Sequence, residues 1–258
     1  MSHARPPRVL VIAGSDSSGG AGIQADIKTI TMLGGYAMTA ITAVTAQNTR
    51  GVRGVEALSP DFVAAQIDAC MEDIGVEAVK IGMLGSTDIA EVVADRLEDL
   101  PCPIVFDPVM VATSGSVLAD EATIAAFEWL MELATLTTPN VPELKALGGA
   151  AALKDKGIAF LAKGGDADGP MVEDRLVRPG QPDKVWSEAR IVTRHTHGTG
   201  CTLSSAIATH LARGLPLEEA IEKARQFVRE ALHAAPGYGG GAGPMGHQAV
   251  RLDYPSSS

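Results

Sequence analysis

The sequence predicts an α/β fold in which helices cover both faces of a mainly parallel sheet. Short apolar runs of strand length alternate with segments of helical periodicity, which is the pattern of β-α-β units. The apolar runs are nearly continuous, as expected of strands that are buried on both faces. Six runs of this kind are predicted as strands: Val9–Ala13, Ala37–Ala46, Ala78–Met83, Ile104–Phe106, Thr135–Thr138 and Ile158–Ala162.

Two of the helices between these strands carry clear start signals. Ser59 precedes Pro60 and Asp61, which predicts a capped helix that runs to about Ile74. Ser86 begins a second capped helix, which runs to about Leu100 with its apolar residues along one stripe.

The pattern changes after residue 165. Met171–Val177 and Val185–Thr193 alternate more regularly and carry turn residues, which predicts antiparallel edge strands. Two helices are predicted next, at Gly200–Arg213 and Pro216–Ala234. Pro236–Gly246 holds six glycines in eleven residues, which predicts a loop or a mobile tail. Because no repeat, linker or break in composition divides the chain, we predict a single domain with a glycine-rich C-terminal tail from about residue 236 to residue 258.

Composition excludes several classes of protein. The 258 residues include 21 Lys and Arg against 31 Asp and Glu, a net charge of −10, with no basic run that could bind nucleic acid. The N-terminus is too polar for a signal peptide, and no apolar run approaches the ~18 residues that span a membrane. Three cysteines without a C-x-x-C pair predict reduced thiols and a cytoplasmic protein.

A glycine-rich loop, Gly14–Gly22, lies between the first strand and a helix, where open α/β sheets bind ligands. It approaches two nucleotide-binding patterns. The P-loop pattern fails because Gly20 stands where a phosphate-binding lysine is required. The dinucleotide pattern at Gly20-x-Gly22-x-x-Ala25 fails because no acidic residue follows at about 20 residues. A turn without a ligand is the alternative reading of this loop.

The segment His195–Leu203 gives the stronger signal. Gly198 and Gly200 allow successive backbone N–H groups to converge at the start of a helix, which favours a phosphoryl-binding cradle. Cys201 lies in the first turn of that helix, where we expect a lowered thiol pKa. The alternative is that Cys201 is a small buried packing residue. His195 and His197 lack the third ligand that a zinc site requires.

Seven motifs occur in the order found in a known kinase family: Ala13–Asp26, Thr45–Thr49, Lys80–Leu84, Asp107–Ala112, Thr138–Glu143, Lys163–Gly165 and His197–Leu203. This colinear set resembles the hydroxymethylpyrimidine/phosphomethylpyrimidine kinases of thiamine biosynthesis, which belong to the ribokinase-like superfamily. The resemblance covers about residues 9–235.

The resemblance implies a ribokinase-like three-layer sandwich that forms a homodimer. It implies ATP- and Mg²⁺-dependent phosphorylation of 4-amino-5-hydroxymethyl-2-methylpyrimidine, and then of the monophosphate to the diphosphate. The positions that match the family's pyrimidine-binding residues are Gly14, Asp26, Gln47 and Met83. Those that match the nucleotide-binding residues are Asn140, Glu143 and Lys163, with Glu143 also at the metal. The catalytic positions are Lys163 and the anion hole of Gly198, Thr199, Gly200 and Cys201.

The chemistry of these residues is compatible with such roles. The Asp26 carboxylate and the Gln47 amide can pair with an amino group and ring nitrogens, and Met83 can lie against a flat ring. Lys163 can neutralise phosphate charge, and Glu143 can hold Mg²⁺ through water. Each also has a structural alternative. These are a helix-capping acid for Asp26, a solvated amide for Gln47, a core methionine for Met83, a surface lysine for Lys163 and a helix-stabilising acid for Glu143.

Some alternatives stay open. Most ribokinase-like sugar kinases carry an aspartate where this sequence has Cys201, so the sulfur either accepts the substrate proton or only belongs to the cradle. A pyridoxal-type kinase of the same superfamily is the nearest alternative function, although Gln47 within Ala46–Thr49 favours the pyrimidine. A nicotinamide-dependent reductase and a non-catalytic nucleotide sensor are the more distant alternatives.

Overall fold

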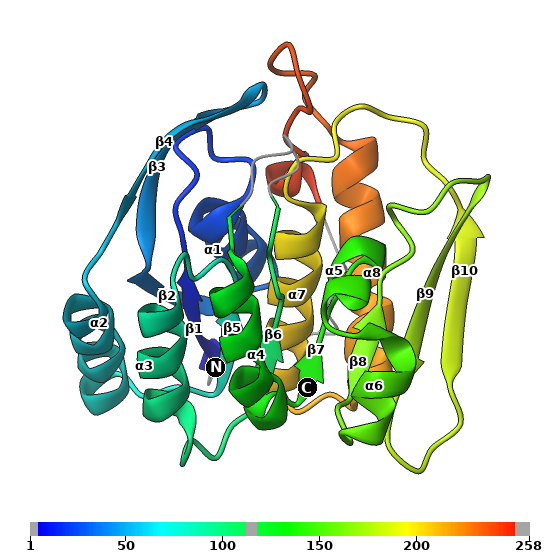
Figure 1. The fold of residues 1–258 in the computed structure, drawn as a ribbon. Coiled ribbons are helices and arrows are strands. Elements are labelled where there is room, and N and C mark those ends of the chain that lie inside the picture. The colour runs from blue at the N-terminus through cyan, green and yellow to red at the C-terminus, as the bar shows by residue number, and fades with distance from the viewer. Residues whose placement is uncertain (1–4, 112–117, 251–258) are drawn as a thin grey trace.

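One eight-stranded sheet forms the centre of the protein. A computed structural model describes residues 5–111 and 118–250 (Figure 1). In spatial order the strands are β10 (Lys184–Ala189), β9 (Met171–Val177), β8 (Phe160–Ala162), β7 (Leu136–Thr137), β6 (Ile104–Phe106), β5 (Ala78–Ile81), β1 (Arg8–Ala13) and β2 (Tyr36–Ile41). The strands from β8 to β2 run parallel, whereas β9 pairs antiparallel with β8 and β10 pairs antiparallel with β9. The predicted sheet type and the antiparallel edge are therefore confirmed.

Helices cover both faces of this sheet, as Figure 1 shows. One face carries α1 (Gly22–Met32), α7 (Thr199–Ala212) and α8 (Leu217–His233). The other carries α2 (Pro60–Asp73), α3 (Thr87–Leu97), α4 (Glu121–Leu133), α5 (Val141–Ala146) and α6 (Gly149–Asp155). Successive residues of β1 are buried in opposite directions: Val9 and Val11 pack in the core beside α7, whereas Leu10 and Ile12 pack in the core beside α3. Burial on both sides is why β1 reads as an unbroken apolar run.

The two predicted helix starts are confirmed by their capping contacts. The Ser59 hydroxyl accepts a hydrogen bond from the Phe62 amide at the start of α2, and Ser86 accepts one from the Ile89 amide at the start of α3. Each contact satisfies an amide that the first turn of a helix leaves without a partner.

The predicted strand Ala37–Ala46 is wrong in extent, because it contains two strands of different sheets. After β2 ends at Ile41, β3 (Ala43–Asn48) leaves the central sheet and pairs with β4 (Gly51–Ala57) as an antiparallel hairpin. The change of direction occurs at Thr42, whose hydroxyl donates to the Met83 carbonyl oxygen at 2.8 Å. A continuous apolar run does not reveal where a chain leaves its sheet.

The glycine-rich segment 236–246 packs against the body of the protein as a loop, followed by a short 3₁₀ helix, η1 (His247–Ala249). The Gly241 amide donates to the Thr49 hydroxyl, and Met245 is buried. Residues 1–4, Ala112 of the fourth motif and residues 251–258 of the predicted tail lie outside the described residues. Among the described helices, none combines the length and the apolar character needed to cross a membrane.

Candidate active site

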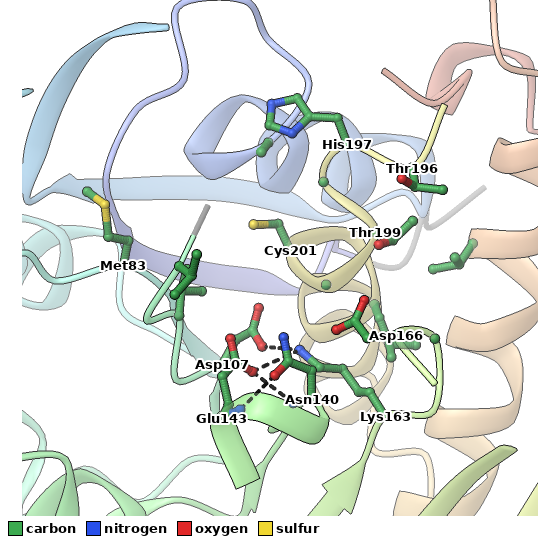
Figure 2. A pocket seen from close by; sticks show the side chains of 18 of the residues that line it. Met83, Asp107, Asn140, Glu143, Lys163, Asp166, Thr196, His197, Thr199 and Cys201 are labelled. Atoms are coloured by element: carbon green, nitrogen blue, oxygen red, sulfur yellow. Dashed lines mark hydrogen bonds and ion pairs between the residues drawn. The ribbon is translucent and has the colours of Figure 1, made fainter. Parts of the chain in front are cut away.

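A cavity of about 790 Å³ opens where the parallel strands end and α1 and α7 begin. Strand ends of this kind are where open α/β sheets bind their ligands. Among the predicted site residues, all except Asp26 line this cavity: Gly14, Gln47, Met83, Asn140, Glu143, Lys163, Gly198, Thr199, Gly200 and Cys201. Figure 2 shows Met83 on one side of the pocket, the Asp107–Lys163 group on another, and Cys201 between them in this view.

The charged end of the cavity is organised around Lys163, which follows β8. Its Nζ lies 2.7 Å from Asp107 Oδ1 and 3.8 Å from Glu143 Oε2. Asp107 follows β6 and also accepts a hydrogen bond from the Thr138 hydroxyl at 3.0 Å. Burial opposes the charged form of Lys163, but Asp107 and Glu143 hold the pKa of Lys163 above its ordinary value. Lys163 is therefore a fixed cation in the cavity wall.

The glycine loop before α7 lies directly against this cation. Gly198 adopts a left-handed conformation (φ 86°), and a side chain there would overlap the carbonyl oxygen of Gly20. A Cβ atom on Gly200 would lie 3.2 Å from Lys163 Nζ and 3.3 Å from Asp107 Oδ2. The N-terminus of α7 and the Lys163 ammonium consequently face the same space, and both favour an anion there.

Asn140 and Glu143 form a capping box at the start of α5. The Glu143 amide donates to Asn140 Oδ1, and the Asn140 amide donates to Glu143 Oε2, both at 2.8 Å. Burial raises the pKa of Glu143 to about 7, while Lys163 opposes that rise. Helix stabilisation, the structural alternative for Glu143, is therefore present in the structure, and its carboxyl group still faces the cavity.

The carboxyl groups of Asp107 and Glu143 are the hard oxygen donors at this end of the cavity. In residues 5–111 and 118–250, no group of three or more His, Cys, Asp and Glu side chains could hold a metal ion. Mg²⁺ commonly uses only one or two carboxylates, with water and substrate phosphates as its other ligands. The donor set therefore fits Mg²⁺ that arrives with a nucleotide, and it does not fit a resident zinc ion.

Cys201 lies in the first turn of α7, and the predicted lowering of its pKa is wrong. Burial raises the pKa of the Cys201 thiol to about 11, and the carboxylates of Asp26 and Asp107 add to that rise. Lys80 and a hydrogen bond from the Gly22 backbone oppose the rise without overcoming it. The positive end of a helix stabilises a thiolate only where loss of water does not cost more. Cys201 is therefore a thiol at neutral pH.

At the opposite end of the cavity, Gln47 and Met83 present uncharged side chains. Gln47 on β3 accepts a hydrogen bond from the Thr45 hydroxyl at 3.3 Å, and Met83 follows β5. A side chain on Gly14 would overlap the methyl group of Met83, so the thioether lies directly on the loop backbone. An amide and a polarisable sulfur suit a flat, neutral heteroaromatic ring.

Asp26 is the one predicted site residue that does not line the cavity, and its role as a pyrimidine contact stays a prediction. It is fully buried on α1, and its two carboxylate oxygens lie 3.1 and 2.9 Å from Lys80 Nζ. The Ser205 hydroxyl on α7 donates to Asp26 at 2.6 Å. The carboxylate is engaged because Lys80 carries a charge inside the apolar strand β5 and requires a buried partner.

Sequence reasoning missed several residues that line the cavity. Asp107 begins one of the seven motifs, and its position at the end of a predicted strand could have identified it as a site residue. Asp16 and His197 also line the cavity, but they come together from distant segments. The apolar wall of the cavity was missed as well because its residues come from separate elements: Val172, Ile191, Leu203, Val228 and Leu232.

Comparison with known proteins identifies relatives along nearly the whole chain. The family model for phosphomethylpyrimidine kinase matches residues 16–246. The hydroxymethylpyrimidine/phosphomethylpyrimidine kinase of Synechococcus elongatus is 44% identical over 255 residues, which cover 93% of this chain and 97% of that protein. The thiamine biosynthesis multifunctional protein of Corynebacterium efficiens is 42% identical over 264 residues. That match covers 95% of this chain but 35% of the longer protein.

Solved structures agree with the fold. The ADP complex of pyridoxal kinase from Bacillus subtilis superposes with a TM-score of 0.86 at 34% identity, covering 95% of this chain and 99% of that one. Phosphomethylpyrimidine kinase from Clostridium difficile 630 superposes with a TM-score of 0.73 at 40% identity, covering 87% of this chain and 98% of that one. The resemblance seen in the motifs is confirmed, and this chain belongs to the phosphomethylpyrimidine kinase family.

Proposed function

We propose that this protein transfers the γ-phosphoryl group of ATP to the hydroxymethyl oxygen of 4-amino-5-hydroxymethyl-2-methylpyrimidine, and then phosphorylates the monophosphate to the diphosphate. One observation carries the proposal. A single cavity joins an anion-binding end, where Gly200 packs on Lys163 and Asp107, to an uncharged end formed by Gln47 and Met83. This arrangement supports transfer of a charged group onto a neutral ring alcohol.

The uncharged end would bind the pyrimidine. The Gln47 side-chain amide can donate to a ring nitrogen and accept from the 4-amino group, while Met83 lies against the ring face. Gly14 keeps the loop backbone close to the ring. Asp26 would support this end of the cavity, because its pairing with Lys80 joins α1 to β5 and its hydrogen bond with Ser205 joins α1 to α7.

The nucleotide would occupy the rest of the cavity. The apolar wall defined above can cover a purine base, and the ADP complex of the Bacillus subtilis pyridoxal kinase supports nucleotide binding in this fold. Backbone amides from Gly198 to Cys201 would receive the γ-phosphate, with Lys163 beside them. Asp107 and Glu143 would hold Mg²⁺ through their carboxylates. The ion supplies charge neutralisation on the phosphate oxygens.

The transfer follows from this placement. The hydroxymethyl oxygen forms a bond to the γ-phosphorus, the bond from the γ-phosphorus to the β,γ-bridging oxygen breaks, and ADP leaves. Lys163 and the loop amides stabilise the charge of the transferring group. The hydroxyl proton passes either to the Cys201 sulfur or, if Cys201 is only part of the cradle, to an oxygen of the transferring phosphoryl group. Because the Cys201 thiol is protonated at neutral pH, a role as its acceptor requires that bound substrates first lower the thiol pKa. If Cys201 is only part of the anion-binding cradle, its thiol pKa does not need to change.

A coupled assay of ADP release tests the proposed function. Purified protein with MgATP is given the pyrimidine alcohol, its monophosphate, pyridoxal, or no acceptor, and products are identified by mass spectrometry. We expect ADP release with both pyrimidines and the formation of mono- and diphosphate, at higher kcat/KM than with pyridoxal. Preference for pyridoxal would establish the alternative kinase function, and ADP release that no acceptor stimulates would contradict both.

The hairpin β3–β4, which lies outside the central sheet, is a candidate interface for the predicted homodimer. Val44 and Val55 on this hairpin are each 48% exposed, although they are apolar. We propose that a second copy covers them. Light scattering after size exclusion should give twice the chain mass, and Val55→Asp should give monomers.

The acidic composition supports the proposal that the protein binds neither nucleic acid nor membranes. A cytoplasmic location stays a prediction.

A further inference from the structure

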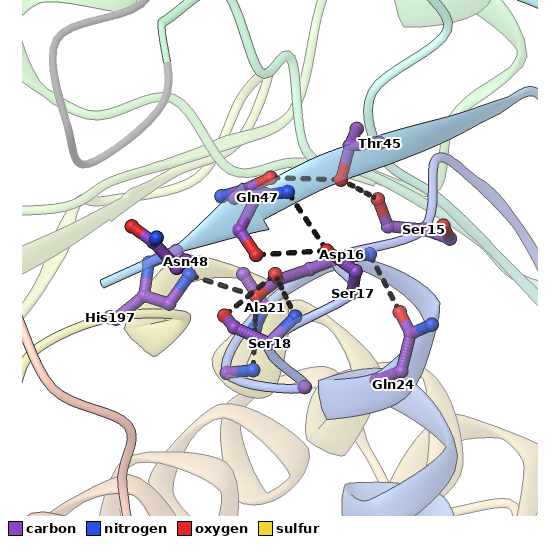
Figure 3. A network of polar contacts seen from close by, with 12 residues as sticks. Ser15, Asp16, Ser17, Ser18, Ala21, Gln24, Thr45, Gln47, Asn48 and His197 are labelled. Atoms are coloured by element: carbon purple, nitrogen blue, oxygen red, sulfur yellow. Dashed lines mark hydrogen bonds and ion pairs between the residues drawn. The ribbon is translucent and has the colours of Figure 1, made fainter. Parts of the chain in front are cut away.

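A buried contact between a histidine and an aspartate joins the two glycine loops of the cavity. His197 Nε2 lies 2.9 Å from Asp16 Oδ2, and the two side chains are 5% and 2% exposed (Figure 3). Asp16 belongs to the loop after β1, and His197 immediately precedes Gly198. The pair therefore connects the segment that leads to the pyrimidine end with the segment that would bind the γ-phosphate.

Asp16 organises its own loop through the same carboxylate. Oδ2 accepts hydrogen bonds from the amides of Gly20 and Ala21 at 2.9 and 2.8 Å. Oδ1 accepts from the amide and hydroxyl of Ser18 at 2.9 and 2.7 Å. Although burial disfavours the carboxylate, bonds from His197 and Ser18 hold the pKa of Asp16 well below its ordinary value. Asp16 is thus a permanent anion whose oxygens are fully engaged.

The loops also touch at two further points. The Gly20 carbonyl oxygen lies so close to Gly198 that a side chain there would overlap it. At the end of the first loop, the Gly22 backbone is hydrogen bonded to Cys201. The His197 amide donates to the Gly243 carbonyl oxygen at 3.1 Å, which fixes the other side of the histidine. A shift of His197 would therefore move the amides that begin α7.

We propose that Asp16 and His197 are positioning residues: their side-chain hydrogen bond holds the loop Gly14–Gly22 and the loop Thr196–Cys201 in the one arrangement that aligns the acceptor alcohol with the γ-phosphate. This inference rests on the proposed function for its kinetic consequence and on geometry alone for its structural one. It assigns His197 no contact with the reacting atoms. Its Nε2 hydrogen is directed to Asp16.

Substitutions at both ends of the pair test the inference. His197→Ala removes the contact, Asp16→Asn removes the charge at nearly constant volume, and His197→Gln keeps a donor at similar reach. His195→Ala is the matched control, because it changes a histidine two residues away that does not contact Asp16. The measurements are kcat, KM for both substrates, melting temperature and amide hydrogen exchange in peptides spanning 14–24 and 196–203.

We expect His197→Ala and Asp16→Asn to lower kcat by about ten- to a hundredfold, since small displacements of aligned groups cost about that much. KM for ATP should change less than about threefold, because the groups that hold the nucleotide remain. The double variant should be no slower than the slower single variant. His197→Gln should recover most of kcat, and His195→Ala should match the wild type.

Hydrogen exchange separates failure of this inference from failure of the proposed function. If the wild type does not phosphorylate the pyrimidine, faster exchange of residues 198–201 in His197→Ala still supports the positioning role of Asp16 and His197. Unchanged exchange in these amides contradicts it, as does a wild-type kcat in both single variants or an additive loss in the double variant. Loss of folding in His197→Ala, Asp16→Asn and His197→Gln would also contradict it, because the pair would then be structural only.

Discussion

The two ends of the cavity differ in how they are built. At the phosphoryl end, Lys163 Nζ lies 2.7 Å from the Asp107 carboxylate and 3.8 Å from the Glu143 carboxyl group. At the pyrimidine end, Gln47 and Met83 present an amide and a thioether, with no net charge. The comparison teaches that the protein fixes charged side chains where the phosphoryl group is transferred. It selects the pyrimidine ring through shape and single hydrogen bonds.

The largest expected effect tests the charged end. Lys163→Met should lower kcat by about 10²–10³-fold, because it removes a preorganised cation beside the transferring phosphoryl group. Steady-state kinetics should show little change in KM for the pyrimidine, since the substitution lies at the other end. Lys154→Met, which removes a surface lysine paired with Asp183, is the control and should leave kcat unchanged. Equal losses in the two variants would contradict the assignment.

A second prediction concerns the sulfur that lies between the two ends. Because burial raises the pKa of Cys201 to about 11, the reactive thiolate fraction should grow about tenfold per pH unit. Alkylation by iodoacetamide, followed by mass spectrometry of the peptide that contains Cys201, should therefore accelerate about a hundredfold from pH 7 to pH 9. A rate that levels off below pH 8 would show a lowered pKa and would restore the thiolate interpretation.

A third prediction concerns the pH dependence of Mg²⁺ binding at the charged end. Glu143 has a raised pKa of about 7, so the carboxyl group is mostly protonated at pH 6 and mostly ionised at pH 8. Mg²⁺ must displace that proton at the lower pH, so its apparent affinity should be about tenfold weaker at pH 6 than at pH 8. Titration of activity with Mg²⁺ measures this. Glu143→Gln should abolish the difference; if the difference persists unchanged, another group is responsible.

The smallest expected effect belongs to the neutral end. Gln47→Ala removes about one hydrogen bond to the ring, so kcat/KM for the pyrimidine should fall about fivefold. KM for ATP should stay unchanged. The comparison with Lys163→Met is direct, because one variant should impair selection of the acceptor and the other the chemical step. A loss in KM for ATP that equals the loss for the pyrimidine would mean that the two ends are not separate.

The sequence predicted most of the central fold and ten of the residues that line the cavity. Strands buried on both faces and helices with clear caps, such as α2 at Ser59, carry strong local signals. The hairpin β3–β4 was missed because its first strand continues an apolar run that β2 begins. The departure at Thr42 depends on a contact with Met83, which lies far away in sequence.

The site residues also divide into those that a local sequence pattern identifies and those that only the fold reveals. Gly198–Cys201 could be identified because glycines followed by a helix form a local pattern. The pairing of Asp26 with Lys80 could not be read locally, although a lysine inside the apolar strand β5 indicated that some buried acid must exist. The Cys201 pKa was misjudged because helix position is visible in sequence, whereas burial and the nearby Asp107 carboxylate are visible only in the fold.

The central claim is that the γ-phosphate of ATP binds at the loop before α7. The most direct measurement is a crystal structure of the protein with a non-hydrolysable ATP analogue, Mg²⁺ and the pyrimidine alcohol. We predict that the terminal phosphate accepts hydrogen bonds of about 3 Å from the amides between Gly198 and Cys201, with Lys163 beside it and the hydroxymethyl group facing it. A terminal phosphate bound away from that loop, with the pyrimidine distant from Gln47, would contradict the account.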